Sequence, residues 1–454
     1  MPAKSILLLL LLNFSVQIIA QADDDSYVVT GSKVIGSVRD GEKIRELIGN
    51  VKLTQGDLTI TCDKAIEYQS KEEVELIGNV ILNRDSTNIY TPRAYYYGEN
   101  QSTYTDTNVI LQDGPVQLAA ESGYYFSDIE LAEFYGNVKL IDTVNTLYSD
   151  KLIYYNNTDS AIAVDNVTIT DKKSSIQADS LIHIRKRNYS LAFGNVRIDN
   201  PENNIVITGQ NLEDFGDRNL SMVMGDAVLT KIDTSENREP DTLIILSASM
   251  ESYDDSTSKL VARDSVRIIR GEFSSLNEYS IYYKQEERIF TYKDEWDERP
   301  PLLWYEESQL LGDTINIYLK DEQLNLIDIR NNALVLSVIE GYQNRYDQIS
   351  GDSIKMYFDN QELARTEVFG NVLSIYYIFE DEVANGVLKS SSENAKLYFA
   401  DNEISNVRLF GSVKSEYHPE DLIKGKEMEF LLPAYIIYDI RPDKKEILSH
   451  IPNF

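Results

Sequence analysis

The sequence contains very little cysteine and histidine. Cys62 is the only cysteine among 454 residues, so an intramolecular disulfide framework is excluded. The three histidines, His183, His418 and His450, lie far apart and lack the spacing of metal ligands. Zinc motifs, a nucleophile elbow and a phosphate-binding loop are also missing. We therefore expect no metal site, no cofactor and no enzymatic activity.

Long apolar runs are missing beyond the first 22 residues. Those residues combine Lys4, an apolar stretch from Ile6 to Leu12 and the small-residue triplet Ala20-Gln21-Ala22. A positive start, an apolar middle and a cleavage-like end are typical of a secretory signal peptide. Later segments are too short or too polar to cross a bilayer as a helix. We therefore predict export with cleavage, and no transmembrane segment in the mature chain.

Positive charge is scarce. The chain has 43 Lys and Arg against 74 Asp and Glu, a formal net charge of −31. Such a surface repels polyanions, so nucleic acid is excluded as a partner. Glycine and proline are modest, at 22 and 11 residues, whereas tyrosine reaches 30. This composition favours folded β-strands over disorder.

Asparagine followed by valine recurs every 29 residues through six units. The asparagine column is Asn50, Asn79, Asn108, Asn137, Asn166 and Asn195, and the valine column is Val51, Val80, Val109, Val138, Val167 and Val196. A fixed period of this size indicates a stacked architecture of similar units. The asparagines are interpreted as shaping a bend, because Gly-Asn pairs tolerate left-handed backbone angles inside a strand.

Within each unit the apolar residues alternate with polar ones, which is typical of strands with one buried face. The first leg carries Leu53, Leu82, Leu111, Leu140, Ile169 and Ile198, and the second leg carries Ile60, Ile89, Leu118, Leu147 and Ile176. Turns are expected at Gln55-Gly56-Asp57 and Ser70-Lys71-Glu72. The predicted unit is a bent hairpin, and stacked hairpins would form two facing antiparallel sheets.

A break is predicted at residues 296–309, which contain Pro300-Pro301 and both tryptophans. Beyond it, longer repeat units start at Gly312, Gly351 and Ser392, and the last forty residues do not repeat. We therefore predict a signal peptide at 1–22, an N-terminal β-repeat domain at 23–295, a boundary at 296–309, and a C-terminal β-repeat domain at 310–454 that ends in a cap.

The fragment GNVKLTQGDLTITCDKAIEYQ, with its recurring GNV, resembles the OstA/LptA-like family of periplasmic lipopolysaccharide-transport proteins. The similarity is strongest from about Gly41 to Asp226, and the segment RPPLLWYEESQLLGDTI with the long units resembles a longer OstA-like subgroup. The resemblance implies an incomplete jelly-roll, in which two antiparallel sheets meet in a V around an apolar groove. It further implies that the groove carries the acyl chains of lipid A toward the outer membrane. Implied partners are other transport components, and further copies joined end to end.

The inward valine, leucine and isoleucine columns are the candidate lipid-groove residues. They are Val51, Leu53, Ile60, Val80, Leu82, Ile89, Val109, Leu111, Leu118, Val138, Leu140, Leu147, Val167, Ile169, Ile176, Val196 and Ile198. The same columns would equally pack a closed core, since periodicity gives only the direction of a side chain. A non-catalytic scaffold or surface adhesin therefore stands as the alternative, with a carbohydrate-active β-solenoid as a distant one.

Overall fold

The computed structural model describes residues 26–443 except 85, 144, 156, 234–240, 321–322, 361, 381–382 and 401–402. The predicted signal peptide therefore lies outside the described residues. Within them the chain forms thirty β-strands and only short helical segments, so the all-β prediction is confirmed. No helix in this part of the chain is long and apolar enough to cross a bilayer. The chain divides into two compact units, one ending at Phe134 and one starting at Tyr135.

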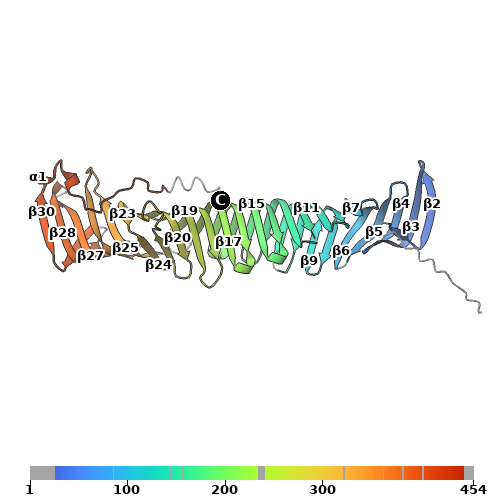
Figure 1. Cartoon of the computed structure of the whole chain (residues 1–454), viewed down its shortest axis with the longest axis horizontal. Helices are drawn as coiled ribbons and strands as arrows, with labels where there is room; N and C mark the ends of the chain where they lie inside the picture. The colour runs from blue at the N-terminus through green and yellow to red at the C-terminus, as the bar shows by residue number, and fades with distance from the viewer. Residues whose placement is uncertain are drawn as a thin grey trace, which may run out of the picture. The chain divides into compact units, whose positions relative to one another are not determined.

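The strands of the first unit follow one another as an antiparallel meander, and Figure 1 shows them side by side in sequence order. They are β1 (Val28–Thr30), β2 (Lys33–Arg39), β3 (Glu42–Gln55), β4 (Leu58–Tyr68), β5 (Glu73–Arg84), β6 (Thr87–Tyr97), β7 (Ser102–Thr105), β8 (Val109–Asp113), β9 (Val116–Ala120) and β10 (Ser122–Phe126). The turns between β3, β4 and β5 fall where the sequence predicts them.

The second unit has the same antiparallel pattern. Strand β11 (Leu131–Ile141) spans the division. The others are β12 (Thr146–Tyr155), β13 (Ser160–Thr170), β14 (Ser175–Ile184), β15 (Tyr189–Asn200), β16 (Ile205–Phe215), β17 (Leu220–Asp233), β18 (Asp241–Tyr253), β19 (Lys259–Arg270), β20 (Phe273–Tyr283), β21 (Arg288–Tyr292), β22 (Leu302–Tyr305), β23 (Ser308–Leu311), β24 (Thr314–Lys320), β25 (Gln323–Val338), β26 (Tyr346–Asp359), β27 (Glu362–Glu380), β28 (Val383–Ala400), β29 (Glu403–Phe410) and β30 (Lys414–Pro419).

Long strands bend where the repeat places Gly-Asn, as predicted. In the pairing of β3 with β4 the register shifts between Ile48 and Val51, and Gly49 and Asn50 have φ of 77° and 49°. These left-handed angles insert extra residues into one strand and so produce a β-bulge. The bulge divides each strand into two halves. We call the half that carries Val51 and Leu53 arm A, and the half that carries Leu47 arm B.

The bulge asparagines also bind the neighbouring strand. The Nδ2 atom of Asn79 donates to Asp63 Oδ2 at 2.8 Å, and that of Asn166 donates to Asp150 Oδ2 at 2.7 Å. Asn195 donates likewise to Asp179. Asn79, Asn166 and Asn195 are therefore structural, since they join adjacent strands at the bend, whereas Asn108 lies where the strand is interrupted.

Of the positions inside the sheet where the repeat would place a bulge, two are interrupted instead. In the first unit β6 pairs with β7 along arm B and with β8 along arm A, so the chain leaves the sheet between Thr105 and Val109. Here Thr107 occupies the glycine position of the repeat. In the second unit β20 pairs with β21 and β22 in the same way. The connecting loop holds Pro300-Pro301, whereas the domain boundary at 296–309 stays a prediction.

After β30 the chain leaves the sheet. It forms a short helix α1 (Glu420–Ile423) and a 3-10 turn (Glu427–Glu429), then continues without regular structure to Asp443. We call residues 420–443 the strap. Figure 1 shows the strap leaving α1 and running back past β23. The non-repeating segment thus lies along the strands of the second unit.

Candidate functional site

In the first unit, the arm A candidates form a closed apolar ladder. Leu53 pairs with Ile60, Ile60 with Leu82, Ile89 with Leu111, and Leu111 with Leu118. Directly paired side chains share one face of a sheet, so the two predicted columns merge into one row. All of these side chains are buried, from 0% exposed for Leu53 to 6% for Ile89.

In the second unit the same ladder is partly open. Leu147 pairs with Ile169, Ile169 with Ile176, Ile176 with Ile198, and Ile198 with Ile207. Leu147 is buried, but the four isoleucines are partly exposed. The row continues into Leu229, Ile245 and Ile268, which are buried again. Strands β13 to β16 therefore carry apolar side chains that point inward and still reach solvent.

The facing wall, arm B, explains why the first unit is closed. Its outermost inward row there contains Val74, Tyr96, Thr103 and Tyr125. Tyr96 is fully buried, and the ring of Tyr27 lies edge-on to it at 5.7 Å between centroids. Large aromatic rings in this row occupy the space between the arms.

In the second unit the same row of arm B keeps Tyr154 and His183 but also has the small side chains of Ala161, Ser190 and Ser221. The row runs across successive strands as a chain of pairs, each residue with the next: Tyr154, Ala161, His183, Ser190, Asp214 and Ser221. All six are partly exposed. Alanine and serine are smaller than the tyrosines that occupy this row in the first unit. We call the predicted space between this row and the isoleucines of β13 to β16 the groove.

The rim of the groove is polar and acidic. His183 Nδ1 lies 3.0 Å from Ser190 Oγ, and Ser221 Oγ donates to Asp214 Oδ1 at 2.6 Å. Burial lowers the pKa of His183, although the nearby carboxylates of Asp142, Asp159 and Asp214 act in the opposite direction. His183 is therefore expected to be neutral at pH 7, and the rim to carry net negative charge.

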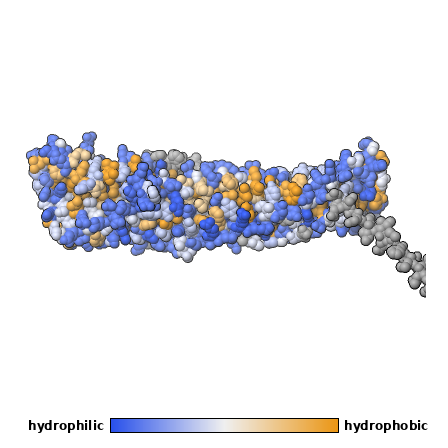
Figure 2. All heavy atoms as spheres, viewed as in Figure 1, coloured by the Kyte–Doolittle hydropathy of each residue, from blue (hydrophilic) through white to orange (hydrophobic). Residues whose placement is uncertain are grey.

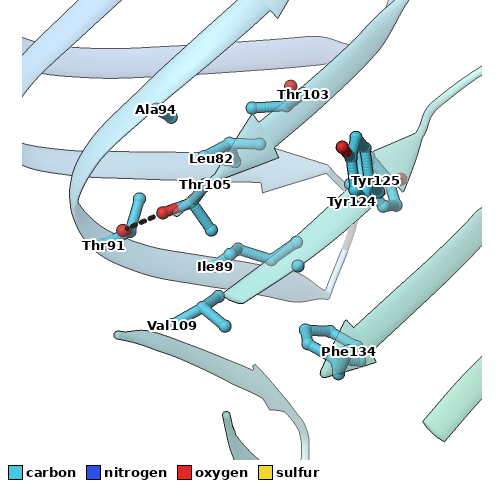
Figure 3. A pocket seen from close by; sticks show the side chains of 11 residues that line it. Leu82, Ile89, Thr91, Ala94, Thr103, Thr105, Val109, Tyr124, Tyr125 and Phe134 are labelled. Carbon is cyan, nitrogen blue, oxygen red and sulfur yellow. Dashed lines mark hydrogen bonds between the residues drawn. The ribbon is translucent and has the colours of Figure 1, made fainter. Parts of the chain in front are cut away.

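A small pocket lies inside the first unit, at the interrupted strand. Leu82, Ile89, Val109 and Phe134 provide apolar walls, as Figure 3 shows. Thr91 Oγ1 lies 2.8 Å from Thr105 Oγ1 at its edge. The interruption at Asp106–Asn108 separates the arms locally, but the enclosed space is too small for a lipid.

The seventeen predicted groove residues thus fall into two groups. Thirteen are buried, and Leu140, Ile169, Ile176 and Ile198 are partly exposed. Lipid contact by any of them stays a prediction. The rim row of arm B was not predicted. The 29-residue step also relates Tyr96, Tyr125, Tyr154 and His183, so this periodic column would have predicted the row.

Metal-binding and thiol chemistry have little support among the described residues. No group of three or more His, Cys, Asp or Glu side chains is arranged there to hold a metal ion. Cys62 is 7% exposed, and burial raises its pKa to about 11. Its thiol fills a small inward position and has no reactive neighbour that would make it a nucleophile.

Comparison with known proteins identifies part of the chain. Residues 28–179 match the family model described as OstA-like protein, which confirms the resemblance over that range. Among solved structures, the chain is similar to LptH from Pseudomonas aeruginosa, the LptA-homologous periplasmic component of a lipopolysaccharide transport device. That similarity has 16% identity and a TM-score of 0.25, and covers 28% of this chain and 85% of LptH. No curated protein matches the chain.

Proposed function

We propose that the protein is a periplasmic bridge protein of lipopolysaccharide transport, which carries lipid A acyl chains in the groove toward the outer membrane. The observation that supports this most directly is the partly exposed isoleucine row of β13 to β16. The OstA-like match, over residues 28–179, covers β13 and the first half of β14 and ends before β15 and β16. Transfer of each methylene from water into such a groove is worth about 0.8 kcal/mol, so several acyl chains would bind firmly.

The acidic rim sets a condition on the head group. Asp142 and Asp214 repel phosphates, so the phosphorylated sugars would have to stay in solvent, with divalent cations between the charges. The tails alone would then enter the groove. Binding by acyl chains, with the head group outside, is the form of recognition that this charge distribution favours.

The free strand edges suit association of further copies end to end. At the first edge of the sheet the chain runs from β1 on arm A to β2 on arm B. At the last edge it runs from β29 on arm B to β30 on arm A. A second copy would therefore continue the antiparallel alternation. Val34 and Val38 on β2, and Val407 on β29, are at least 50% exposed. Unpaired edges with exposed apolar residues favour strand addition.

Site-specific photocrosslinking to labelled lipid A tests the groove. We expect strong crosslinks from a photoreactive residue at Ile176 or Ile198, because both point inward and reach solvent. Weak crosslinks are expected from the buried Leu82. Gln177 is the matched control, since it neighbours Ile176 and is exposed on the opposite face. Equal crosslinking at Ile176 and Gln177 would contradict the proposal.

The alternative function is a rigid non-catalytic scaffold. The fully buried ladder of the first unit supports it, since that interior has no room for an acyl chain. Incubation of the mature protein with lipopolysaccharide and with soluble polysaccharide separates the possibilities. Retained lipid supports transport, no effect supports a scaffold, and cleaved polysaccharide would indicate an enzyme.

A further inference from the structure

The face of arm A that points away from the groove is apolar between β20 and β28. Tyr305 on β22 contacts the ring of Phe358 on arm B at 5.0 Å between centroids, so it points inward. Because neighbouring strand residues point to opposite faces, Trp304 points outward. It is nevertheless only 6% exposed, and Leu336 on β25 and Tyr377 on β27 are buried in the same cluster. On β14 the outward position in the row of the buried Leu302 holds the exposed Gln177.

The strap is what covers this outward face. Ile423, Phe430 and Leu432 are buried in the same cluster as Trp304, and Tyr435 and Tyr438 pack against its margin. The strap therefore forms a third layer on the second unit. Its side chains fill an apolar surface that the sheet would otherwise expose.

Two buried glutamines of the sheet bind the backbone of the strap. Gln348 donates from Nε2 to the carbonyl of Phe430 at 3.0 Å and accepts from the amide of Leu432 at 2.9 Å. Gln309 donates to the carbonyl of Ile436 at 2.9 Å and accepts from the amide of Tyr438 at 2.8 Å. Each glutamine thus forms hydrogen bonds with the carbonyl of one strap residue and with the amide of the residue two positions later. An extended segment offers this pair of groups along one edge whatever its side chains are.

A buried arginine anchors the start of the strap. Arg345, with a side chain 4% exposed, makes two hydrogen bonds to the carboxylate of Glu420 at 2.9 and 2.7 Å. It also approaches Glu427 Oε1 at 3.4 Å. A bidentate arginine is selective for a carboxylate. The face therefore combines backbone hydrogen bonding, an apolar strip and one acid-specific position.

We propose that this outward face is a peptide-binding surface, that the strap is its resident ligand, and that an extended segment of a partner protein displaces the strap. Such a segment would carry apolar side chains two residues apart, as Phe430 and Leu432 are, and an acidic residue upstream for Arg345. The glutamines accept such a segment because they contact only backbone atoms.

The other side of the strap supports exchange. Leu422, Met428, Ile436, Ile437 and Ile440 are between 42% and 61% exposed. Figure 2 shows hydrophobic residues, in orange, at the surface around α1, β28 and β30. The resident strap thus satisfies only one of its two apolar sides, and replacement by a partner would cover more apolar surface.

The test is binding of a fluorescent peptide, with the sequence of residues 420–441, to the full-length protein. In the double variant Glu420→Gln/Glu427→Gln the resident strap loses its contacts to Arg345, whereas the added peptide retains them. We expect peptide affinity to rise at least about tenfold over the wild-type chain, because a buried charge left without its partner is costly.

Removal of the glutamine contacts provides the opposite variant. In the Glu420→Gln/Glu427→Gln background, Gln309→Leu with Gln348→Leu should lower peptide affinity by at least about tenfold. Gln112→Leu, at an exposed position of β8, is the matched control and should change nothing. Hydrogen exchange of the Leu432 and Tyr438 amides in the wild-type chain gives a readout without substitutions, and should quicken when peptide is added. Equal affinity in all variants, or unchanged exchange with excess peptide, would overturn the proposal.

Discussion

At three of the bulges, a glycine lies against an aspartate of the neighbouring strand: Gly78 against Asp63, Gly194 against Asp179 and Gly370 against Asp352. Gly194 has φ of 75°, and a Cβ atom there would lie 2.2 Å from Asp179 Oδ2 and 2.8 Å from its Cγ. The same aspartate accepts hydrogen bonds from Asn195. The position thus requires glycine for two reasons, the backbone angle and the space beside the carboxylate.

We expect Gly194→Ala to lower the free energy of unfolding by about 1–3 kcal/mol, because alanine is strained at this φ and displaces Asp179. Urea unfolding followed by circular dichroism measures the change. Gly36→Ala on β2 is the control, since a Cβ atom added at Gly36 would have no heavy atom within 4 Å. That variant should change stability by less than about 0.5 kcal/mol. Similar losses at both glycines would show that the bulge geometry is not the cause.

Among the elements, the strands and their bends were predictable, but the groove was not. Alternation and the Gly-Asn pairs place β3 to β5 and their bulges almost to the residue. Openness depends instead on the size of side chains on the facing arm, where the buried Tyr96 stands in one unit and the partly exposed Ala161 in the other. The strap contacts were also out of reach, because Gln309 binds a residue 127 positions away and no periodicity relates them.

The groove can be filled from arm B. We expect Ala161→Trp on β13 to reduce lipid retention several-fold, because an indole there would occupy the space beside the inward isoleucines. Co-purified or added lipid, quantified by mass spectrometry, measures the effect. Ile162→Trp is the matched control, since the neighbouring residue points to the opposite face. Unchanged retention in Ala161→Trp would place the lipid elsewhere or exclude it.

For the whole molecule, the dominant property is its charge of −31. An anionic lipid approaches such a surface against repulsion, which divalent cations would reduce. We therefore expect chelation with EDTA to weaken binding of lipid A several-fold, and added Ca²⁺ to restore it. A lipid with the same acyl chains and an uncharged head group is the control and should bind equally in both conditions. Equal binding of lipid A with and without the chelator would contradict this account.

The proposed export to the periplasm would place the buried Cys62 in an oxidising compartment. An accessible lone thiol there would be prone to couple two chains covalently or to be trapped by disulfide-forming enzymes. With a pKa of about 11, the Cys62 thiol is almost entirely protonated at neutral pH, and the surrounding sheet shields its sulfur. The chain therefore presents no reactive thiol of its own, so an engineered surface cysteine could be labelled without competing labelling of Cys62.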